Sequence, residues 1–404
     1  MADGSLGRIL VFTGARQTGK TTLTKHIFSH YTYLSIEDPV LRAQYAKLSA
    51  PEWNNLYPLA ILDEVQKEPL LVESIKAVYD QWPGPRYVLL GSSQLLLLEK
   101  VKESLAGRCV IIELFPLTIP ELLTKDWTDP VEDSPFQRYI SRPETPPELL
   151  PSFLLDKRMA EKKAAWDHYV RFGGYPALTK KEMTDAERYT WLRAYVRTYL
   201  ERDIRDLASF RDLEPFIKLQ QYLALQTGQI INASSIAAQL GLSVKTVQRY
   251  IRYFELSYQA ITLPAWSRNQ NKRLTRAPKL HYLDNGVLQA VLRKRGGVSG
   301  GEFESLVTAE IYKQLRCLNA DVDFYHLRTH DGFEIDLLIE TERGYVAFEI
   351  KMSDKIRPSD AAHLKKLPAL LDKPLLGGFL LSQDNETREL FPGIFAVHAA
   401  YFLG

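Results

Sequence analysis

The stretch "RILVFTGARQTGKTTLTKHIF" (Arg8–Phe28) joins an apolar strand to a helical pattern through a glycine-rich turn. The turn "GARQTGKT" fits the phosphate-loop pattern G-x-x-x-x-G-K-[ST], and it stands between a strand and a helix as that pattern requires. Main-chain N–H groups at such a turn bind phosphate, a lysine neutralises its charge, and a hydroxyl binds Mg²⁺. The residues expected to bind the nucleotide are Gly14, Ala15, Arg16, Gln17, Thr18, Gly19, Lys20, Thr21 and Thr22, with Thr21 also on the metal.

A second strand, "LAILDEVQ", supplies two carboxylates. Its four apolar residues end at Asp63 and Glu64, and parallel sheets bind ligands at the carboxyl ends of their strands. We expect Asp63 to hold Mg²⁺ and Glu64 to activate the attacking water as a general base. Because the chain has no Asn-Lys-x-Asp motif for reading guanine, ATP is the expected nucleotide.

Strands and helices alternate throughout residues 7–117. The strand candidates are "RILVFTG", "YTYLSI", "LAILDEV", "RYVLLGS" and "CVIIELF". This alternation predicts an α/β fold with a parallel sheet covered by helices on both faces. The prolines of residues 125–154 indicate an irregular insertion or linker. The expected domains are residues 1–124, 125–212, 213–293 and 294–404.

Composition sets outer bounds on function. The length of 404 residues suggests two to four domains, and the 45% hydrophobic and 25% charged residues are typical of a globular protein. With 51 basic and 49 acidic residues, net charge indicates no partner. The two cysteines form no metal-ligand pattern. We expect a cytoplasmic protein with no membrane segment.

These motifs resemble the AAA-type ATPases, specifically the archaeal and bacterial family with a nuclease-like C-terminal domain. The resemblance implies a phosphate-sensing polar residue after the fourth strand, where Ser92 or Ser93 stands in "LLGSSQ". It implies an arginine that reaches a neighbouring subunit's ATP, at Arg108, and hence a homo-oligomer. "FGGYPAL" is similar to the lid motif of signal-transducing ATPases, which would place Pro176 near the adenine; a kinked helix start is the alternative.

The middle segment has helix-turn-helix and winged-helix features. "SSIAAQL", Gly241 and a second helix from Ser243 fit the first motif. DNA contacts are expected from Lys245, Gln248, Arg249 and Arg252 on the second helix. Further contacts are expected from a basic wing with Arg268, Lys272, Arg273 and Arg276, followed by Lys279. The alternative is an inter-domain or protein-binding module.

The strands "FEIDLLIE" and "YVAFEIK" are expected to form a hairpin. Alternation places Asp336 on one strand and Glu349 with Lys351 on the other, all on one face, and the helix "EFESLVTAEIYKQL" adds Glu304. Clustered carboxylates are costly without a cation, so Asp336 and Glu349 are expected to bind Mg²⁺ or Mn²⁺. The layout resembles the restriction-endonuclease superfamily, in which these four residues would be catalytic. A surface salt bridge and an inactive docking domain are the alternatives.

Together these features predict an ATP-hydrolysing protein that processes DNA. In this hypothesis, nucleotide binding assembles the subunits and positions the winged helix and nuclease-like domain on DNA. The alternative hypothesis is an ATP-dependent regulatory switch whose C-terminal parts dock a protein partner.

Overall fold

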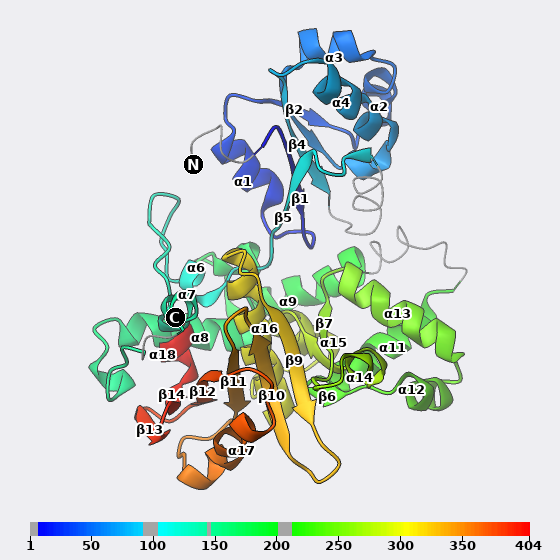
Figure 1. Ribbon diagram of the computed structural model, residues 1–404. Helices are drawn as coiled ribbons and strands as arrows, with labels where there is room; N and C mark the ends of the chain where they lie inside the picture. The colour runs from blue at the N-terminus through cyan, green and yellow to red at the C-terminus, as the bar shows by residue number, and fades with distance from the viewer. Residues whose placement is uncertain (1–6, 92–103, 144–146, 201–211) are drawn as a thin grey trace. The chain divides into compact units, whose positions relative to one another are not determined.

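The computed structural model describes residues 7–91, 104–143, 147–200 and 212–404 (Figure 1). The chain forms two compact units. Unit 1 comprises residues 1–116, 198–211 and 256–258, and unit 2 comprises residues 117–197, 212–255 and 259–404. Most of the regions predicted as lid and winged helix therefore lie in the same unit as the C-terminal domain. None of the helices in the described ranges is long and apolar enough to span a membrane.

Unit 1 contains a five-stranded parallel sheet in the order β2-β3-β4-β1-β5. The strands are those expected from the sequence: β1 (Ile9–Thr13), β2 (Thr32–Ser35), β3 (Leu59–Asp63), β4 (Arg86–Gly91) and β5 (Cys109–Glu113). The helices are α1 (Lys20–Ile27), α2 (Pro39–Tyr45), α3 (Ala50–Leu56) and α4 (Leu70–Gln81).

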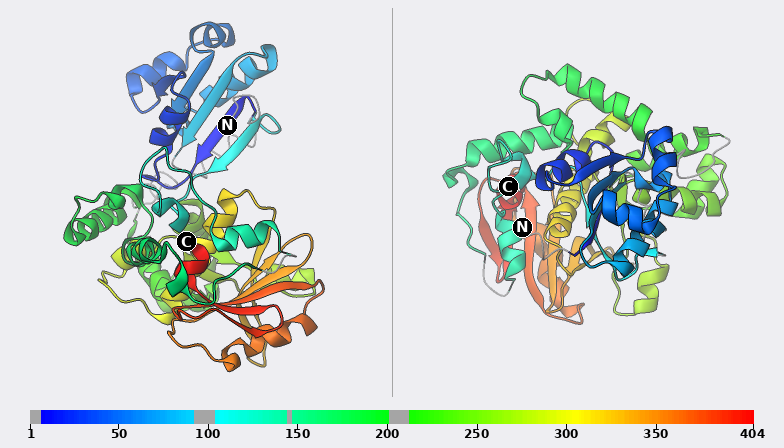
Figure 2. Two further views of the ribbon diagram at one scale, coloured as in Figure 1. Left: turned by 90° about the vertical axis from the view of Figure 1, so that its left-hand side faces the viewer. Right: turned by 90° about the horizontal axis from the view of Figure 1, so that it is seen from above.

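Helices cover both faces of this sheet (Figures 1 and 2). Alternate residues of β1 point to opposite sides, so that Ile9 packs into a core with α3 and α4. Its neighbour Leu10 packs into a second core with Phe28, beyond the end of α1. The predicted α/β class is confirmed.

The larger sheet of unit 2 is mixed and has the order β13-β14-β12-β11-β10-β9. The predicted hairpin is present, because β10 pairs antiparallel with β11, while β11, β12 and β14 run parallel. The strands are β9 (Asp323–Arg328), β10 (Glu334–Glu340), β11 (Tyr345–Ile350), β12 (Leu375–Ser382), β13 (Arg388–Phe391) and β14 (Ile394–His398).

Helices of the C-terminal segment that pack against this sheet include α16 (Gly300–Cys317) and α17 (Ala362–Lys366). Helix α16 is buried on nearly every side over residues 302–315. It therefore carries an unusual number of buried polar side chains, each of which needs an internal partner.

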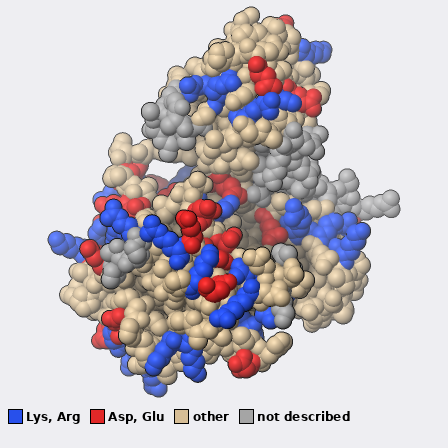
Figure 3. Space-filling model, in the orientation of Figure 1, with Lys and Arg blue, Asp and Glu red and all other residues tan. Residues whose placement is uncertain are grey.

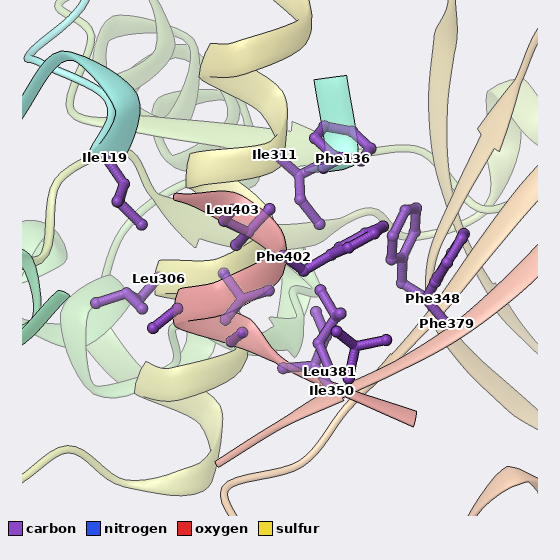
Figure 4. Close-up of a cluster of buried hydrophobic side chains, with 14 of the residues drawn as sticks. Ile119, Phe136, Leu306, Ile311, Phe348, Ile350, Phe379, Leu381, Phe402 and Leu403 are labelled. Carbon is purple, nitrogen blue, oxygen red and sulfur yellow. The ribbon is translucent and has the colours of Figure 1, made fainter. Parts of the chain in front are cut away.

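The segment predicted as a proline-rich insertion or linker instead contributes to this core. Phe136 of α7 (Pro135–Ser141) lies with its ring centroid 5.9 Å from that of Phe348 and 5.8 Å from that of Phe402 (Figure 4). The hydroxyl of Tyr139 donates to the carbonyl oxygen of Leu376 at 2.9 Å. Pro135 starts α7 rather than breaking structure, since proline suits the first helical turn. The helices involved are α6 (Ile119–Leu122), α7, α8 (Met159–Phe172) and the C-terminal α18 (Ala399–Leu403).

The middle segment forms three helices and a small antiparallel sheet in the order β6-β8-β7. The helices are α11 (Glu214–Leu225), α12 (Ala233–Leu240) and α13 (Val244–Leu256), and the strands are β6 (Gln229–Ile230), β7 (Ala260–Leu263) and β8 (Lys279–Tyr282). Gly241 ends α12 at φ 66°, the left-handed conformation that the turn requires. The connection from β7 to β8 contains the short helix α14 (Gln270–Thr275) instead of a plain loop.

Candidate functional site

The phosphate loop closes around the ammonium group of its own lysine. Lys20 Nζ donates hydrogen bonds to the carbonyl oxygens of Gly14 at 2.8 Å and Ala15 at 2.7 Å. Gly14 and Gly19 adopt φ values of 149° and 93°, and a Cβ on Gly14 would lie 2.1 Å from the carbonyl oxygen of Leu114. The loop thus requires glycine at Gly14. It places a cation at the start of α1, where unpaired N–H groups favour an anion.

Asp63 ends β3 and contacts the first turn of α1. Its Oδ2 accepts hydrogen bonds from Thr21 Oγ1 and from the hydroxyl of Tyr33, both at 2.8 Å. Burial, followed by the hydrogen bond to Asp63, raises the pKa of Tyr33, so its phenol stays protonated as a donor. The sequence motifs do not identify Tyr33, because a tyrosine on an outer strand belongs to no recognisable pattern.

Glu64 is held beside the phosphate loop. Its φ of 59° is a left-handed conformation, which is uncommon outside glycine and often marks a functional position. Its Oε1 lies 3.7 Å from Nη1 of Arg16, a phosphate-loop residue, and its Oε2 accepts a hydrogen bond from Nε2 of Gln66. A carboxylate here suits a general base, provided that these partners release it.

The other predicted residues of the nucleotide site have different outcomes. Ser92 lies outside the described residues, and Thr22 is exposed. Arg108 donates from Nε and Nη2 to the carboxylate of Asp80 in α4, at 2.8 and 3.3 Å. A contact with another subunit would therefore require this surface pair to open. Pro176 begins a 3₁₀ turn in unit 2, and its contact with adenine stays a prediction.

The motif "FGGYPAL" has a structural role within unit 2. The N–H of Gly174 donates to Oδ2 of Asp284 at 2.8 Å, and Asp284 also caps α15 (Asn285–Val291). A Cβ on Gly173 would lie 2.1 Å from Asp284 Oδ1, and one on Gly174 would lie 2.1 Å from the carbonyl oxygen of Leu117. The two glycines therefore permit close packing that no other residue allows.

Helix α13 presents a polar face of the predicted kind. Its apolar positions Val247 and Phe254 are buried. The predicted contact residues lie at helical spacings of three, four and seven, which places them on one face. Figure 3 shows Lys and Arg side chains gathered over the α13 region. The four exposed residues of this face are Lys245, Gln248, Arg249 and Arg252.

Two arginines of the predicted wing have protein partners, which corrects their assignment to DNA. Arg268 donates from Nε and Nη2 to three carbonyl oxygens at residues 369–371, at 2.8 to 3.2 Å. Arg273 pairs with Glu340 at 2.9 Å and donates to the hydroxyl of Tyr325 at 3.3 Å. Arg273 would lose its half-buried partner Glu340 if it bound phosphate, whereas Arg268 is exposed and would lose mainly exposed hydrogen bonds.

Two other basic residues of the wing are buried or half-buried. Lys279 is buried, with 2% of its surface exposed, and Arg276 is half-buried. The side chain of Lys272 lies outside the described residues, so its contact stays a prediction.

The predicted carboxylate cluster forms, but around a lysine. Lys279 Nζ lies 2.6 Å from Glu304 Oε1, 3.2 Å from Asp336 Oδ1 and 3.3 Å from Glu334 Oε1. Burial, followed by the charge of Asp336, raises the pKa of Glu304 to about 8 and that of Glu349 to about 9. The cluster thus combines one ammonium with carboxyl groups that burial drives toward their neutral form.

Lys351 does not point into this cluster. Its Nζ donates to Asp360 Oδ1 at 2.8 Å, and its side chain is 40% exposed. Glu349 Oε1 lies 3.6 Å from Nδ1 of His363. The expected convergence of Asp336, Glu349 and Lys351 is supported, because the charges of Asp336 and Lys351 both act on the pKa of Glu349. Glu349 and Lys351 each have a further partner on the segment after β11.

The arrangement does not suit the expected divalent metal. Among the residues that the structure describes, no group of three or more His, Cys, Asp and Glu side chains is arranged to hold an ion. Asp336 has both oxygens engaged, with Oδ2 accepting from the N–H of Ile350 at 2.9 Å. Sequence patterns place Lys279 among the wing cations and not in this cluster, since no short-range pattern links it to Asp336.

Comparison with protein families divides the chain into three parts. Residues 7–123 match the family described as "AAA domain". Residues 163–296 match "Domain of unknown function (DUF8612)", and residues 299–402 match "Domain of unknown function (DUF4143)".

Similar whole proteins carry no functional description. "Uncharacterized protein Rv2008c" of Mycobacterium tuberculosis is 26% identical over 85% of this chain and 70% of its own length. "Uncharacterized protein MJ1544" of Methanocaldococcus jannaschii is 23% identical over 87% of this chain and 77% of its own. The solved structure of a Walker-type ATPase of Pyrococcus abyssi has a TM-score of 0.45 at 13% identity, covering 70% of this chain and 91% of that one.

The family match and the parallel sheet agree on the N-terminal part of the chain. The matched residues include the phosphate loop with Lys20 and Thr21, and Asp63 at the edge of the sheet. Residues 7–123 are an AAA-type P-loop ATPase domain.

Proposed function

We propose that the protein binds and hydrolyses ATP with Mg²⁺. We further propose that α13 binds DNA and that the protein uses ATP hydrolysis in processing this DNA. The observation that carries the first part is the hydrogen bond of 2.8 Å between Thr21 Oγ1 and Asp63 Oδ2. This hydrogen bond joins the start of the phosphate-loop helix to the acidic end of β3. A hydroxyl and a carboxylate at these two positions are the oxygen ligands that P-loop enzymes offer to Mg²⁺.

The residues of the site divide the work of hydrolysis. The N–H groups of the loop and the ammonium of Lys20 bind the β- and γ-phosphates. Thr21 and Asp63 would hold Mg²⁺, which would offset charge on the phosphates when bound. Glu64 takes a proton from the attacking water once Arg16 turns to the phosphates and weakens its contact with Glu64.

Separate measurements of binding and turnover test this division. Lys20→Ala should abolish binding of a fluorescent ATP analogue. Glu64→Gln should keep binding and reduce hydrolysis by roughly 10²- to 10⁴-fold, the usual contribution of a general base. Lys47→Ala, which changes an exposed lysine of unit 1, is the control. Equal hydrolysis by wild type and Glu64→Gln would contradict the role of Glu64.

The trans role of Arg108 is a further part of this proposal. In the absence of a second subunit Arg108 pairs with Asp80, so the hydrolysis rate per subunit should rise with protein concentration. Arg108→Ala should remove that dependence while retaining nucleotide binding. A rate per subunit that is independent of concentration, in wild type and variant alike, would exclude it.

For DNA, the proposal is supported by the exposed face of α13 rather than by the wing. Three α-helices and a three-stranded antiparallel sheet are the elements of a winged helix, in which the second helix of the turn enters the major groove. Arg249→Glu with Arg252→Glu should weaken binding to a labelled duplex and reduce the dependence of log Kd on log salt, by about 0.9 for each phosphate that the variant no longer neutralises. Lys218→Glu is the control, since Lys218 is an exposed lysine on α11 of the same unit. Unchanged affinity in the double variant would refute DNA contact by α13.

A second candidate function is an ATP-dependent switch whose C-terminal parts dock a protein partner. The observation that favours it is the position of Lys279 among the carboxylates, because it argues against cleavage of DNA by this domain. Recovery of a stoichiometric protein partner, without salt-sensitive DNA binding, would support this candidate over the first.

A further inference from the structure

The carboxylate cluster of unit 2 has an internal cation at its centre. Lys279, Glu304, Glu334 and Asp336 form this lysine-centred cluster, with three oxygens within 3.3 Å of one ammonium nitrogen. The carboxylates of Glu304 and Asp336 are nine-tenths buried. Water therefore has little access to the cluster, and Lys279 supplies a buried positive charge beside both acidic groups.

The backbone fixes the lysine in this position. Lys279 is the first residue of β8, the central strand of the small sheet. It is paired with Ile230 of β6 on one side and Leu263 of β7 on the other. Only 3% of its side chain is exposed. The strand therefore fixes the Cα of Lys279, and burial of the side chain keeps its ammonium inside the cluster.

The ammonium occupies the space where a shared metal ion would sit. A Mg²⁺ ion shared by Glu304 Oε1 and Asp336 Oδ1 would need oxygen distances near 2.0 to 2.1 Å, and Lys279 Nζ already lies 2.6 and 3.2 Å from these same two oxygens. Two like charges at such short range repel strongly in a buried site. The side chain of Lys351, which would serve such a metal site, instead pairs with Asp360.

A second buried group faces the same cluster. His281, two residues along β8, is fully buried, and its Nε2 lies 3.9 Å from Glu304 Oε1. Neither ring nitrogen has a hydrogen-bond partner among the described residues. Strand β8 thus directs both a cation and an imidazole at Glu304.

We propose that Lys279 replaces a divalent metal in the carboxylate cluster, so that the C-terminal domain keeps a nuclease-like arrangement but neither binds metal there nor cleaves DNA. The lysine also ties the middle segment to the C-terminal domain, because β8 belongs to the former and Asp336 to the latter. The inference concerns a site separate from the phosphate loop and does not depend on ATP hydrolysis.

Titration with Mn²⁺, followed by electron paramagnetic resonance, tests the proposal in the full chain without nucleotide. The background variant Asp63→Asn removes the metal ligand of the ATPase site. In this background, protein with Lys279 should show no Mn²⁺ site that depends on Asp336. Lys279→Met should tighten Mn²⁺ binding by more than roughly tenfold, since one repelling charge is removed. The added change Asp336→Asn should abolish the gain, and Lys279→Arg, which keeps the charge, should not produce it.

Two results would overturn the proposal. One is Mn²⁺ binding by protein that retains Lys279, lost on Asp336→Asn. The other is a folded Lys279→Met variant that gains no Mn²⁺ site. Lys279→Met leaves carboxylates unpaired and risks unfolding. The comparison of Asp336 with Asp336→Asn in protein that retains Lys279 is therefore repeated by thermal unfolding. If Mn²⁺ raises the melting temperature of protein with Lys279, and Asp336→Asn removes that rise, the proposal fails without any Lys279 variant.

Discussion

Replacing Tyr33 by Phe isolates one hydrogen bond of the nucleotide site. The variant removes only the hydroxyl that donates to Asp63 Oδ2 at 2.8 Å. It keeps the ring, over which Lys25 Nζ lies 3.4 Å from the centroid. We define Tyr33 as a positioning residue, because it acts through Asp63 and touches no predicted part of the nucleotide.

The magnitude follows from the exposure of the acceptor. A hydrogen bond to a charged group contributes about 1.5–3 kcal/mol when it is buried. Asp63 is only half-buried, so water replaces part of the lost interaction, and a cost of about 1 kcal/mol remains. That cost corresponds to roughly a fivefold change in an equilibrium constant. The Mg²⁺ concentration for half-maximal hydrolysis should therefore rise by about fivefold.

The assay is steady-state phosphate release at saturating ATP over a series of Mg²⁺ concentrations. Maximal velocity should change little, because Mg²⁺ at saturation restores the position of Asp63. Tyr57→Phe provides the control, since it removes a hydroxyl from a half-buried tyrosine elsewhere in unit 1. If Tyr33→Phe left the Mg²⁺ dependence unchanged, or lowered only the maximal velocity, the proposed orientation of Asp63 by Tyr33 would be refuted.

Three further predictions concern the stability of unit 2, each measured by urea unfolding. Burial lowers the pKa of His168 to about 4, so the stability it contributes is present above its ordinary pKa of 6.5. As pH falls from 6.5 to 4, the free energy of unfolding of the wild type should fall by roughly 2 kcal/mol more than that of His168→Phe. Parallel pH profiles of the two proteins would contradict this. Gly174→Ala should destabilise the unit by more than roughly 2 kcal/mol, because its Cβ would lie 2.1 Å from a carbonyl oxygen. The control Gly300→Ala should be nearly neutral, because the space around that site is open. Equal stabilities of the two variants would refute the close packing at Gly174. Phe136→Ala should cost about 3–5 kcal/mol, and a cost below 1 kcal/mol would show that α7 is peripheral.

The local features of this protein could be predicted from its sequence because they depend on neighbours along the chain. The phosphate loop needs only a strand, two glycines and Lys20 within a short stretch. The alternation in β10 and β11 predicted the hairpin and placed Asp336 on the same face as Glu349. These patterns report on backbone conformation and burial, which short-range sequence records well.

The partners of charged residues could not be predicted, since they come from distant positions. Lys279 and Asp336 are 57 residues apart, and Arg273 and Glu340 are 67 apart. A run of basic residues without acids has the same composition whether it faces DNA or pairs with the interior of its own fold. The prolines of residues 125–154 were misleading for a related reason: proline is common both in linkers and at helix starts.

Helix α7 packs against elements that are translated much later than α7 itself, and this order has a consequence during synthesis. Phe136 packs against Phe348 and Phe402, so its aromatic surface stays uncovered while the ribosome translates more than two hundred further codons. At about 5–20 residues per second, that delay lasts roughly ten seconds to a minute. We expect a chaperone to cover this aromatic surface on the nascent chain during that interval. A separately expressed fragment beginning near residue 294 would lack the aromatic plug that completes its interior.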